Sequence, residues 1–257
     1  MQQSSSGNNQ DFIRQITTLG AIVGAFIVNV VSNIFPLNGL NIGAISNTLF
    51  KDVLIIPANY AFAIWGLIYL GLFALGIYQF LPSQKNDDDL RKTGYLLVIA
   101  SVSQSIWVYL FLGRFFTLSI VAMLGILIPL IIIHQRLEIG SKRVSRIKKF
   151  CLHAPISIYL SWISVATIVN VACALYFYNW NSWGITNEVW TVIMLLAAAA
   201  ISSVMVIKYQ DIPYTGVTVW ALVAIALKHW DNSLIRNVAI LLAIALMIIA
   251  ITKSWRR

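Results

Sequence analysis

Charged residues are scarce in this chain, and acidic residues are the scarcest. Only 11% of its 257 residues are charged, whereas 59% are hydrophobic and the mean hydropathy is +0.81. A typical soluble domain has about a quarter of its residues charged. The composition therefore excludes an ordinary soluble protein and indicates a chain that lies largely within a membrane.

Ionisable side chains are absent from the middle of the apolar stretches and occur only at their ends. Ion-coupled transporters usually carry such groups inside the membrane, so the sequence argues against secondary active transport. Sodium sites built from backbone carbonyls stay open as an alternative. The histidines His134, His153 and His229 also lie at predicted helix ends, which argues against a pair of histidines that ligate haem within the membrane.

Cysteine is almost absent too. Cys151 and Cys173 lie on one predicted helix, roughly 33 Å apart at 1.5 Å per residue, so they cannot form a disulfide with each other. We expect both to pack as inert side chains. The acidic run 87–89 does not predict a metal site, because consecutive residues point in different directions.

Apolar runs of roughly 18 to 22 residues recur along the chain, which is the length that crosses a bilayer as a helix. The narrowest break between two runs is Gly113 and Arg114, which we interpret as a tight turn. The predicted fold is all-α, a polytopic membrane helical bundle of about eight transmembrane helices. The predicted spans are 15–34, 60–81, 95–112, 115–133, 156–177, 188–208, 212–229 and 235–252.

The net charge of +9 follows a membrane pattern and not that of a protein that binds nucleic acid. With eight spans, all basic residues except Lys51, Arg114, Lys228 and Arg236 fall on one side. This asymmetry predicts that both termini are cytoplasmic. The basic segment 134–153 would also suit anionic lipid.

One predicted helix carries an unusual stripe of side chains. Tyr159, Trp162, Ala166 and Asn170 follow one another at steps of 3, 4 and 4 residues, so they share one helix face. Two aromatic rings, a small residue and an amide suit the wall of a pocket, whereas a helix that only faces lipid needs none of them.

Two further helices carry polar and aromatic faces, although each face taken singly is explained by helix packing. The second span contains Tyr60, Trp65 and Tyr69, and the third contains Gln104, Trp107 and Phe111. An amide within hydrocarbon needs a partner, either across the bundle or in a ligand. The three stripes together favour a shared ligand cavity. The loop 35–58 is either a lid over that cavity or an interfacial connector.

These stripes resemble the TspO/translocator protein family, the tryptophan-rich sensory proteins. That family has proline, tryptophan and tyrosine at matching spacing on its second helix and Asn-x-x-Trp-x-x-x-Phe on its third. Its fifth helix carries an aromatic, Trp, Ala, Asn series. The matching positions are Pro57, Trp65 and Tyr69; Gln104, Trp107 and Phe111; and Tyr159, Trp162, Ala166 and Asn170.

The resemblance also has departures. Of the Lys-Pro-x-Trp-x-Pro-Pro run before the family's second helix only Lys51 and Pro57 are present, and Pro155 lies three positions earlier than expected. Charge counting places the loop 35–58 on the exoplasmic side, opposite to the family. The predicted organisation is a disordered cytoplasmic tail over 1–11, a TspO-like five-helix membrane domain over 12–178 and a three-helix C-terminal membrane extension over 179–257.

The resemblance implies a non-enzymatic membrane receptor or sensor that binds a planar lipophilic ligand, such as a porphyrin or haem, without requiring a cofactor. Alternatives are a transporter of small hydrophobic molecules, a scaffold, or light-dependent porphyrin breakdown. The family often dimerises, so a homodimer is implied too, although we expect Gly20 and Gly24 to serve close packing within the bundle. The expected ligand-binding residues are Tyr60, Trp65, Tyr69, Gln104, Trp107, Phe111, Tyr159, Trp162, Ala166 and Asn170.

Overall fold

The structure, a computed structural model, describes residues 2–255, with side chains from residue 9 onward. It is 82% helical, and residues 2–255 form no strand. Short helical elements occupy several of the connections. The long helices are α1 (Gln2–Ile34), α3 (Ile64–Tyr78), α4 (Asp88–Leu112), α5 (Phe116–Arg136), α7 (Ala154–Phe177), α8 (Asn187–Lys208), α9 (Ile212–Lys228) and α10 (Ser233–Trp255). The short ones are α2 (Ile42–Thr48), α6 (Arg146–Lys148), the 3₁₀ turns Leu37–Gly39, Asn59–Ala63, Pro82–Gln84 and Ser182–Gly184, and the π-helical turn Lys149–His153.

Each predicted span corresponds to one long helix, which confirms the polytopic helical bundle. Within residues 2–255, 7 helices are long and apolar enough to cross a membrane, while α9 is shorter at 17 residues. The tight turn between the third and fourth spans is also confirmed. It is made by Gly113 and Arg114, the latter with a φ of 64°. The chain is therefore an integral multi-pass membrane protein.

The first helix begins earlier than predicted. The sequence predicted a disordered segment over 1–11, but α1 begins at Gln2, and Met1 lies outside the described residues. Part of this segment has partners in the bundle, because the Asp11 carboxylate pairs with Arg14 at 3.2 Å and with Arg91 of α4 at 2.6 Å. The pair with Arg91 attaches this part of α1 to α4.

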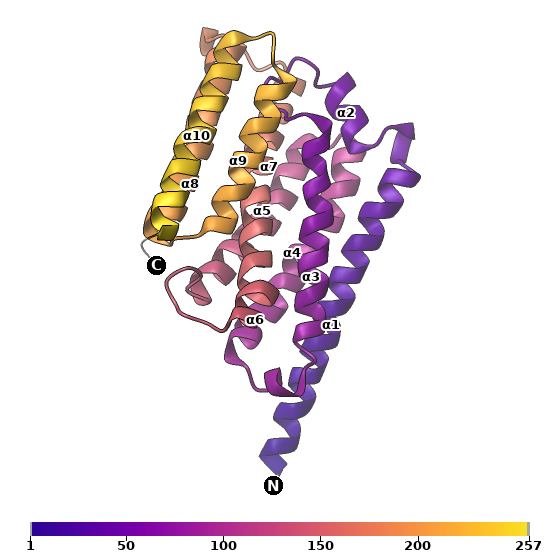
Figure 1. Cartoon of the computed structure of the whole chain (residues 1–257). Coiled ribbons are helices and arrows are strands. Elements are labelled where there is room, and N and C mark those ends of the chain that lie inside the picture. Colours follow the sequence, from indigo (N-terminus) through magenta and orange to yellow (C-terminus); the bar gives the residue numbers. More distant parts are fainter. Residues whose placement is uncertain (1, 256–257) are drawn as a thin grey trace.

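Five helices form a closed ring, and three more pack beside it (Figure 1). Around the ring, α1 contacts α3, α3 contacts α7, α7 contacts α5, α5 contacts α4, and α4 returns to α1. The helices α8, α9 and α10 contact one another, and α9 lies against α7. The arrangement matches the expected five-helix core with three C-terminal helices.

Polar contacts join the C-terminal helices to the ring. On α7, the Ser161 hydroxyl donates to the Tyr214 carbonyl of α9 at 2.7 Å. The Trp220 indole of α9 donates to the Ala61 carbonyl at 3.2 Å. Such bonds are hard to replace in hydrocarbon, so α9 is firmly attached to the core.

The glycine pair of α1 does not pack as expected. A Cβ added at Gly20 or Gly24 would meet no atom within 4 Å, apart from the helix's own backbone. The two glycines therefore lie on a face of α1 that the rest of the bundle leaves open, and the expected close packing within the bundle is wrong. The 3.6-residue period placed both glycines on one face but did not say what that face contacts.

Candidate functional site

A cavity of about 520 Å³ lies within the five-helix ring. Its walls come from α3, α4, α5 and α7, while the end of α1, the helix α2 and the segment before α3 contribute the rest. This volume is in the range of pockets that hold small organic ligands. The lining residues are Asn29, Asn33, Asn41, Ile42, Gly43, Ala44, Ser46, Asn47, Pro57, Asn59, Phe62, Trp65, Trp107, Phe111, Met123, Ile126, Trp162, Ile163, Val165, Ala166, Val169, Asn170 and Cys173.

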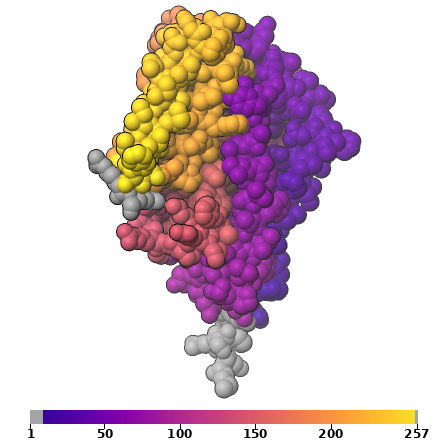
Figure 2. Space-filling model, in the orientation of Figure 1, coloured from indigo at the N-terminus to yellow at the C-terminus, as the bar shows by residue number. Residues whose placement is uncertain are grey.

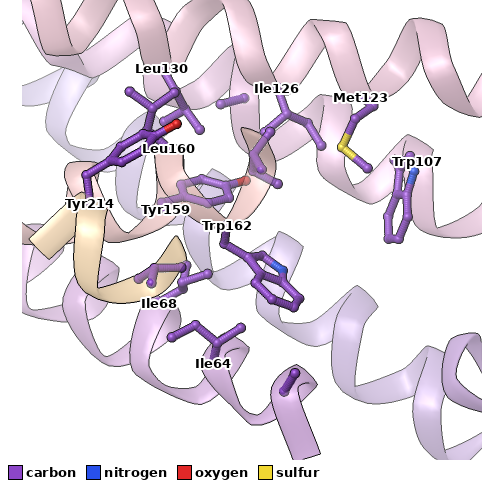
Figure 3. Close-up of a cluster of buried hydrophobic side chains, with 14 of the residues drawn as sticks. Ile64, Ile68, Trp107, Met123, Ile126, Leu130, Tyr159, Leu160, Trp162 and Tyr214 are labelled. Carbon is purple, nitrogen blue, oxygen red and sulfur yellow. The ribbon is translucent and has the colours of Figure 1, made fainter. Parts of the chain in front are cut away.

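Three tryptophans from three different helices give the cavity flat aromatic walls. Trp65 lies on α3, Trp107 on α4 and Trp162 on α7. Figure 3 shows Trp107 and Trp162 on either side of a space that Met123 and Ile126 of α5 also border. Because these helices are apolar all round, only their neighbours decide which rings face the space.

Only one of these three tryptophans donates its indole N–H to an acceptor in the described part of the chain. Trp107 Nε1 donates to Asn170 Oδ1 at 3.3 Å. Neither Trp65 nor Trp162 donates its indole N–H to any group within the described part of the chain. Buried or interfacial indoles usually find an acceptor. The indole N–H groups of Trp65 and Trp162 are thus left without an acceptor in the described part of the chain.

Asn170 is held in place from two sides. Its Oδ1 accepts from Trp107 Nε1, its Nδ2 donates to the Ser119 hydroxyl oxygen of α5 at 3.1 Å, and the residue is 3% exposed. These bonds join α4, α5 and α7 at one point of the wall. The amide predicted as a polar anchor is thus at the cavity, but much of its hydrogen-bonding capacity is used within the protein.

The loop 35–58 covers one end of the cavity. It contains α2, which begins at Ile42. The preceding Asn41 caps the helix, because its side chain accepts from the Ala44 N–H at 2.8 Å. Asn47 Nδ2 donates to Asn59 Oδ1 at 2.8 Å, which ties α2 to the segment that enters α3. Since residues of α2 line the cavity, the structure favours the lid over the interfacial connector.

Gln104 bonds across the bundle and does not line the cavity. Its Nε2 donates to the Tyr69 hydroxyl at 2.6 Å, and its Oε1 accepts from the Tyr159 hydroxyl. The Tyr69 hydroxyl in turn donates to the Ala25 carbonyl of α1 at 3.0 Å. The network joins α1, α3, α4 and α7 beside the cavity, and all of its side chains are buried.

The ten predicted ligand-binding residues therefore separate into three groups. Tyr69, Gln104 and Tyr159 form the buried network and lie outside the lining. Tyr60 is 39% exposed and packs edge-on against Trp220 of α9, with ring centroids 5.0 Å apart, so it lies outside as well. Those that line the cavity are Trp65, Trp107, Phe111, Trp162, Ala166 and Asn170.

Sequence reasoning missed the amide-rich part of the lining and the contribution of α5. Five asparagines besides Asn170 belong to the lining, and so do Met123 and Ile126 of α5. A signal existed in the sequence for the amides, because Asn29 and Asn33 lie one turn apart at the end of an apolar span. No sequence pattern singles out the two apolar residues of α5. The asparagines are Asn29, Asn33, Asn41, Asn47 and Asn59.

The lining suits binding better than acid–base or metal chemistry. Among the described residues that line the cavity there is no Asp, Glu, Lys, Arg or His. Within residues 2–255 no group of three or more His, Cys, Asp or Glu side chains could hold a metal ion. Cys173 is a free, buried thiol. What the cavity provides is aromatic surface, amides and indole N–H donors.

Comparison with known proteins identifies the family. The family model described as TSPO-like protein matches residues 15–252. The match extends beyond 178 and takes in α8 and α9 and most of α10, so the C-terminal helices belong to the matched region. Among curated proteins and among solved structures, no significant match is found. The chain therefore belongs to the TSPO-like protein family, which supports, at a coarse level, a membrane sensor or binding protein.

Proposed function

We propose that the protein is a membrane receptor or sensor that binds a planar lipophilic ligand, a porphyrin or related tetrapyrrole, in the cavity of the five-helix ring. The observation that carries the proposal is the cavity of about 520 Å³ with walls made by Trp65, Trp107 and Trp162. Flat rings stack favourably on such walls, and burial of their apolar surface supplies most of the binding free energy.

The polar groups of the lining favour a ligand with hydrogen-bond acceptors at its edge. The free indole N–H groups of Trp65 and Trp162 would donate to such acceptors. The asparagine side chains of the lining supply further donors and acceptors. A ligand that is apolar on its faces and polar at its periphery satisfies both parts of the lining, since unpaired polar groups in a closed cavity cost free energy.

We expect stacking, and not a bond to a metal, to hold the ligand in this cavity. Among the described lining residues none is a histidine, the commonest axial ligand of haem. Stacking would therefore provide the affinity, and metal-free protoporphyrin should bind about as tightly as haem. Much tighter binding of haem would show that an iron ligand has been overlooked.

Tryptophan fluorescence tests the proposal. Purified protein is titrated with protoporphyrin, haem and a carotenoid, alongside Trp162→Ala and, as a control, Trp230→Ala. Trp230 packs on Arg236, 5.1 Å from its ring centroid to the guanidinium carbon, and lies outside the lining. We expect saturable quenching that Trp162→Ala weakens and Trp230→Ala preserves. If the folded protein shows no saturable quenching, the family resemblance is architectural and a scaffold is the better function.

The orientation of the chain is part of the same proposal. The excess of basic residues on the side of the N-terminus supports a cytoplasmic location of both termini. The lid α2 then lies on the opposite, exoplasmic side. Protease protection of tags at the two termini in sealed vesicles distinguishes this orientation from its inverse.

A further inference from the structure

A second pocket, of about 610 Å³, lies at the other end of the bundle from α2. It is formed by the loop between α5 and α6, the first turns of α7 and the turn between α8 and α9. The loop lies at the surface, near the beginning of α9 and the C-terminal end of α10 (Figure 2). The amide- and tryptophan-lined cavity shares no lining residue with this pocket.

The pocket is built on fixed contacts and not on a loose loop. Gly140 has a φ of +86°, and a Cβ added to it would lie 1.6 Å from the Tyr209 carbonyl oxygen, so only glycine permits this approach. On the inner side, Asp211 Oδ2 lies 2.9 Å from His134 Nε2 and accepts from the Ser157 hydroxyl at 2.7 Å. The approach of Gly140 to Tyr209 and the bonds of Asp211 hold the α8–α9 turn against the α5–α6 loop, α5 and α7.

Positive charge is concentrated on this pocket. Lys142, Arg143 and Lys149 line it. Lys142 lies 3.4 Å from Asp89, but neither Arg143 nor Lys149 forms an ion pair with any residue in the described chain. The neighbouring Lys148 differs, because Asp87 and Asp89 each pair with it at 2.7 Å. Two cations of the lining are thus left without a counter-charge.

A buried histidine without a partner lies in the same lining. His153 is 4% exposed, and its Nε2 has no hydrogen-bond partner in the described part of the chain. A buried polar atom left unpaired costs free energy, so it indicates a missing partner. Lys149, His153 and Ser157 follow one another at steps of four residues, and all three line the pocket. They lie where a π-helical turn meets α7, and π-turns are frequent at functional sites.

The one carboxylate of the lining is already occupied. Asp211 is 2% exposed, and besides His134 and Ser157 it accepts from the Tyr214 N–H at 3.1 Å through Oδ1. Its oxygens are therefore engaged within the protein. What the pocket leaves available is the guanidinium of Arg143, the ammonium of Lys149 and the Nε2 of His153, a donor set that suits a phosphate group.

We infer that this pocket binds a phosphate monoester, supplied either by a lipid headgroup such as phosphatidic acid or by a small soluble phosphate ester. Arg143 and Lys149 supply charge at the mouth. His153 donates from Nε2 to a phosphate oxygen at the buried end. The site is separate from the ligand cavity, so each can be tested without the other.

Titration calorimetry on the full-length protein in detergent micelles tests the inference. The ligands are inorganic phosphate, glycerol 3-phosphate and dihexanoyl phosphatidic acid, with dihexanoyl phosphatidylcholine as the neutral control. The variants are Arg143→Gln and His153→Gln. Arg146→Gln is the matched control, because Arg146 is an exposed arginine of the same basic segment that does not line the pocket.

We expect one-to-one binding of at least one phosphate ligand, weakened about tenfold or more by Arg143→Gln and by His153→Gln and changed less than about twofold by Arg146→Gln. Binding of phosphatidic acid alone identifies a lipid headgroup, and equal binding of glycerol 3-phosphate identifies a soluble ester. Both outcomes support the site. Absence of binding by every phosphate ligand overturns it, as does an equal loss in Arg143→Gln and Arg146→Gln, which would mean diffuse charge attraction. If His153→Gln fails to fold, the comparison of Arg143→Gln with Arg146→Gln decides whether the pocket binds phosphate.

Discussion

Gln104 illustrates how a polar residue in an apolar helix finds its partners. In hydrocarbon an amide must be satisfied by the protein or by a ligand. Here Tyr69 and Tyr159 satisfy it, so the residue predicted as a polar anchor is instead a junction between helices. The spacing of Gln104 and Trp107 would be the same whether the amide bonds to a ligand or to another helix. The sequence therefore could not distinguish these two roles.

Gln104→Leu should therefore lower stability more than it changes ligand affinity. The substitution leaves the Tyr159 hydroxyl, on a residue 0% exposed, without its acceptor, which costs about 1–3 kcal/mol of unfolding free energy. Thermal unfolding in micelles measures the loss. In a Tyr159→Phe background the same substitution should cost clearly less, since no stranded hydroxyl is left. An equal cost in both backgrounds would contradict the network.

At the scale of elements, the proposed lid α2 is the feature on which ligand exchange should depend. The helix α2 has 7 residues, too short to be stable alone, so its cap and its tie to Asn59 matter more than they would in a long helix. The sequence showed an apolar loop with turn-forming residues but not the helix within it. Such a short helix leaves no periodic signal.

Removal of the cap of α2 should accelerate ligand release. Asn41→Ala deletes the bond to the Ala44 N–H and costs about 1 kcal/mol of helix stability, which corresponds to roughly fivefold faster dissociation if the lid must open first. Stopped-flow displacement of protoporphyrin measures the rate. Asn181→Ala removes a comparable cap at the α7–α8 connection and should leave the rate unchanged. Equal rates in the wild type and Asn41→Ala would exclude α2 as the gate.

The sequence predicted the helices well and their faces less well. Runs of apolar residues determine which segments cross the membrane, and even the two-residue break at Gly113 and Arg114 was recognisable. Which face of a uniformly apolar helix turns inward depends on its neighbours. That is why Trp65 and Ala166 were placed at the cavity by their stripes, whereas Met123 was not foreseen.

For the whole molecule, the C-terminal helices are part of one packed unit. The predicted boundary near residue 178 suggested an added domain, whereas the family match extends to residue 252. Bonds between α9 and the core occur along its length, including the Ala58 N–H that donates to the Ala224 carbonyl at 3.1 Å. The core helices therefore have polar groups whose partners lie on α9.

Truncation after residue 186 should therefore destabilise the five-helix ring. Ser157, Ser161 and the Ala61 carbonyl would lose their partners, at about 1 kcal/mol each in addition to the lost apolar packing. The unfolding temperature of the truncated protein in micelles should fall well below that of the full chain. An unchanged temperature with unchanged protoporphyrin affinity would show that residues 12–178 form an independent domain.

The most direct test of the central claim is protoporphyrin affinity in a matched pair of variants on α7. Ala166 lines the tryptophan-walled cavity, whereas Ala172 lies on the same helix and lines a separate groove between α7 and α8. We predict that Ala166→Trp fills the cavity and abolishes binding while the protein stays folded, and that Ala172→Trp binds as the wild type does. Wild-type affinity in Ala166→Trp, or loss only in Ala172→Trp, would contradict the claim that this cavity holds the ligand.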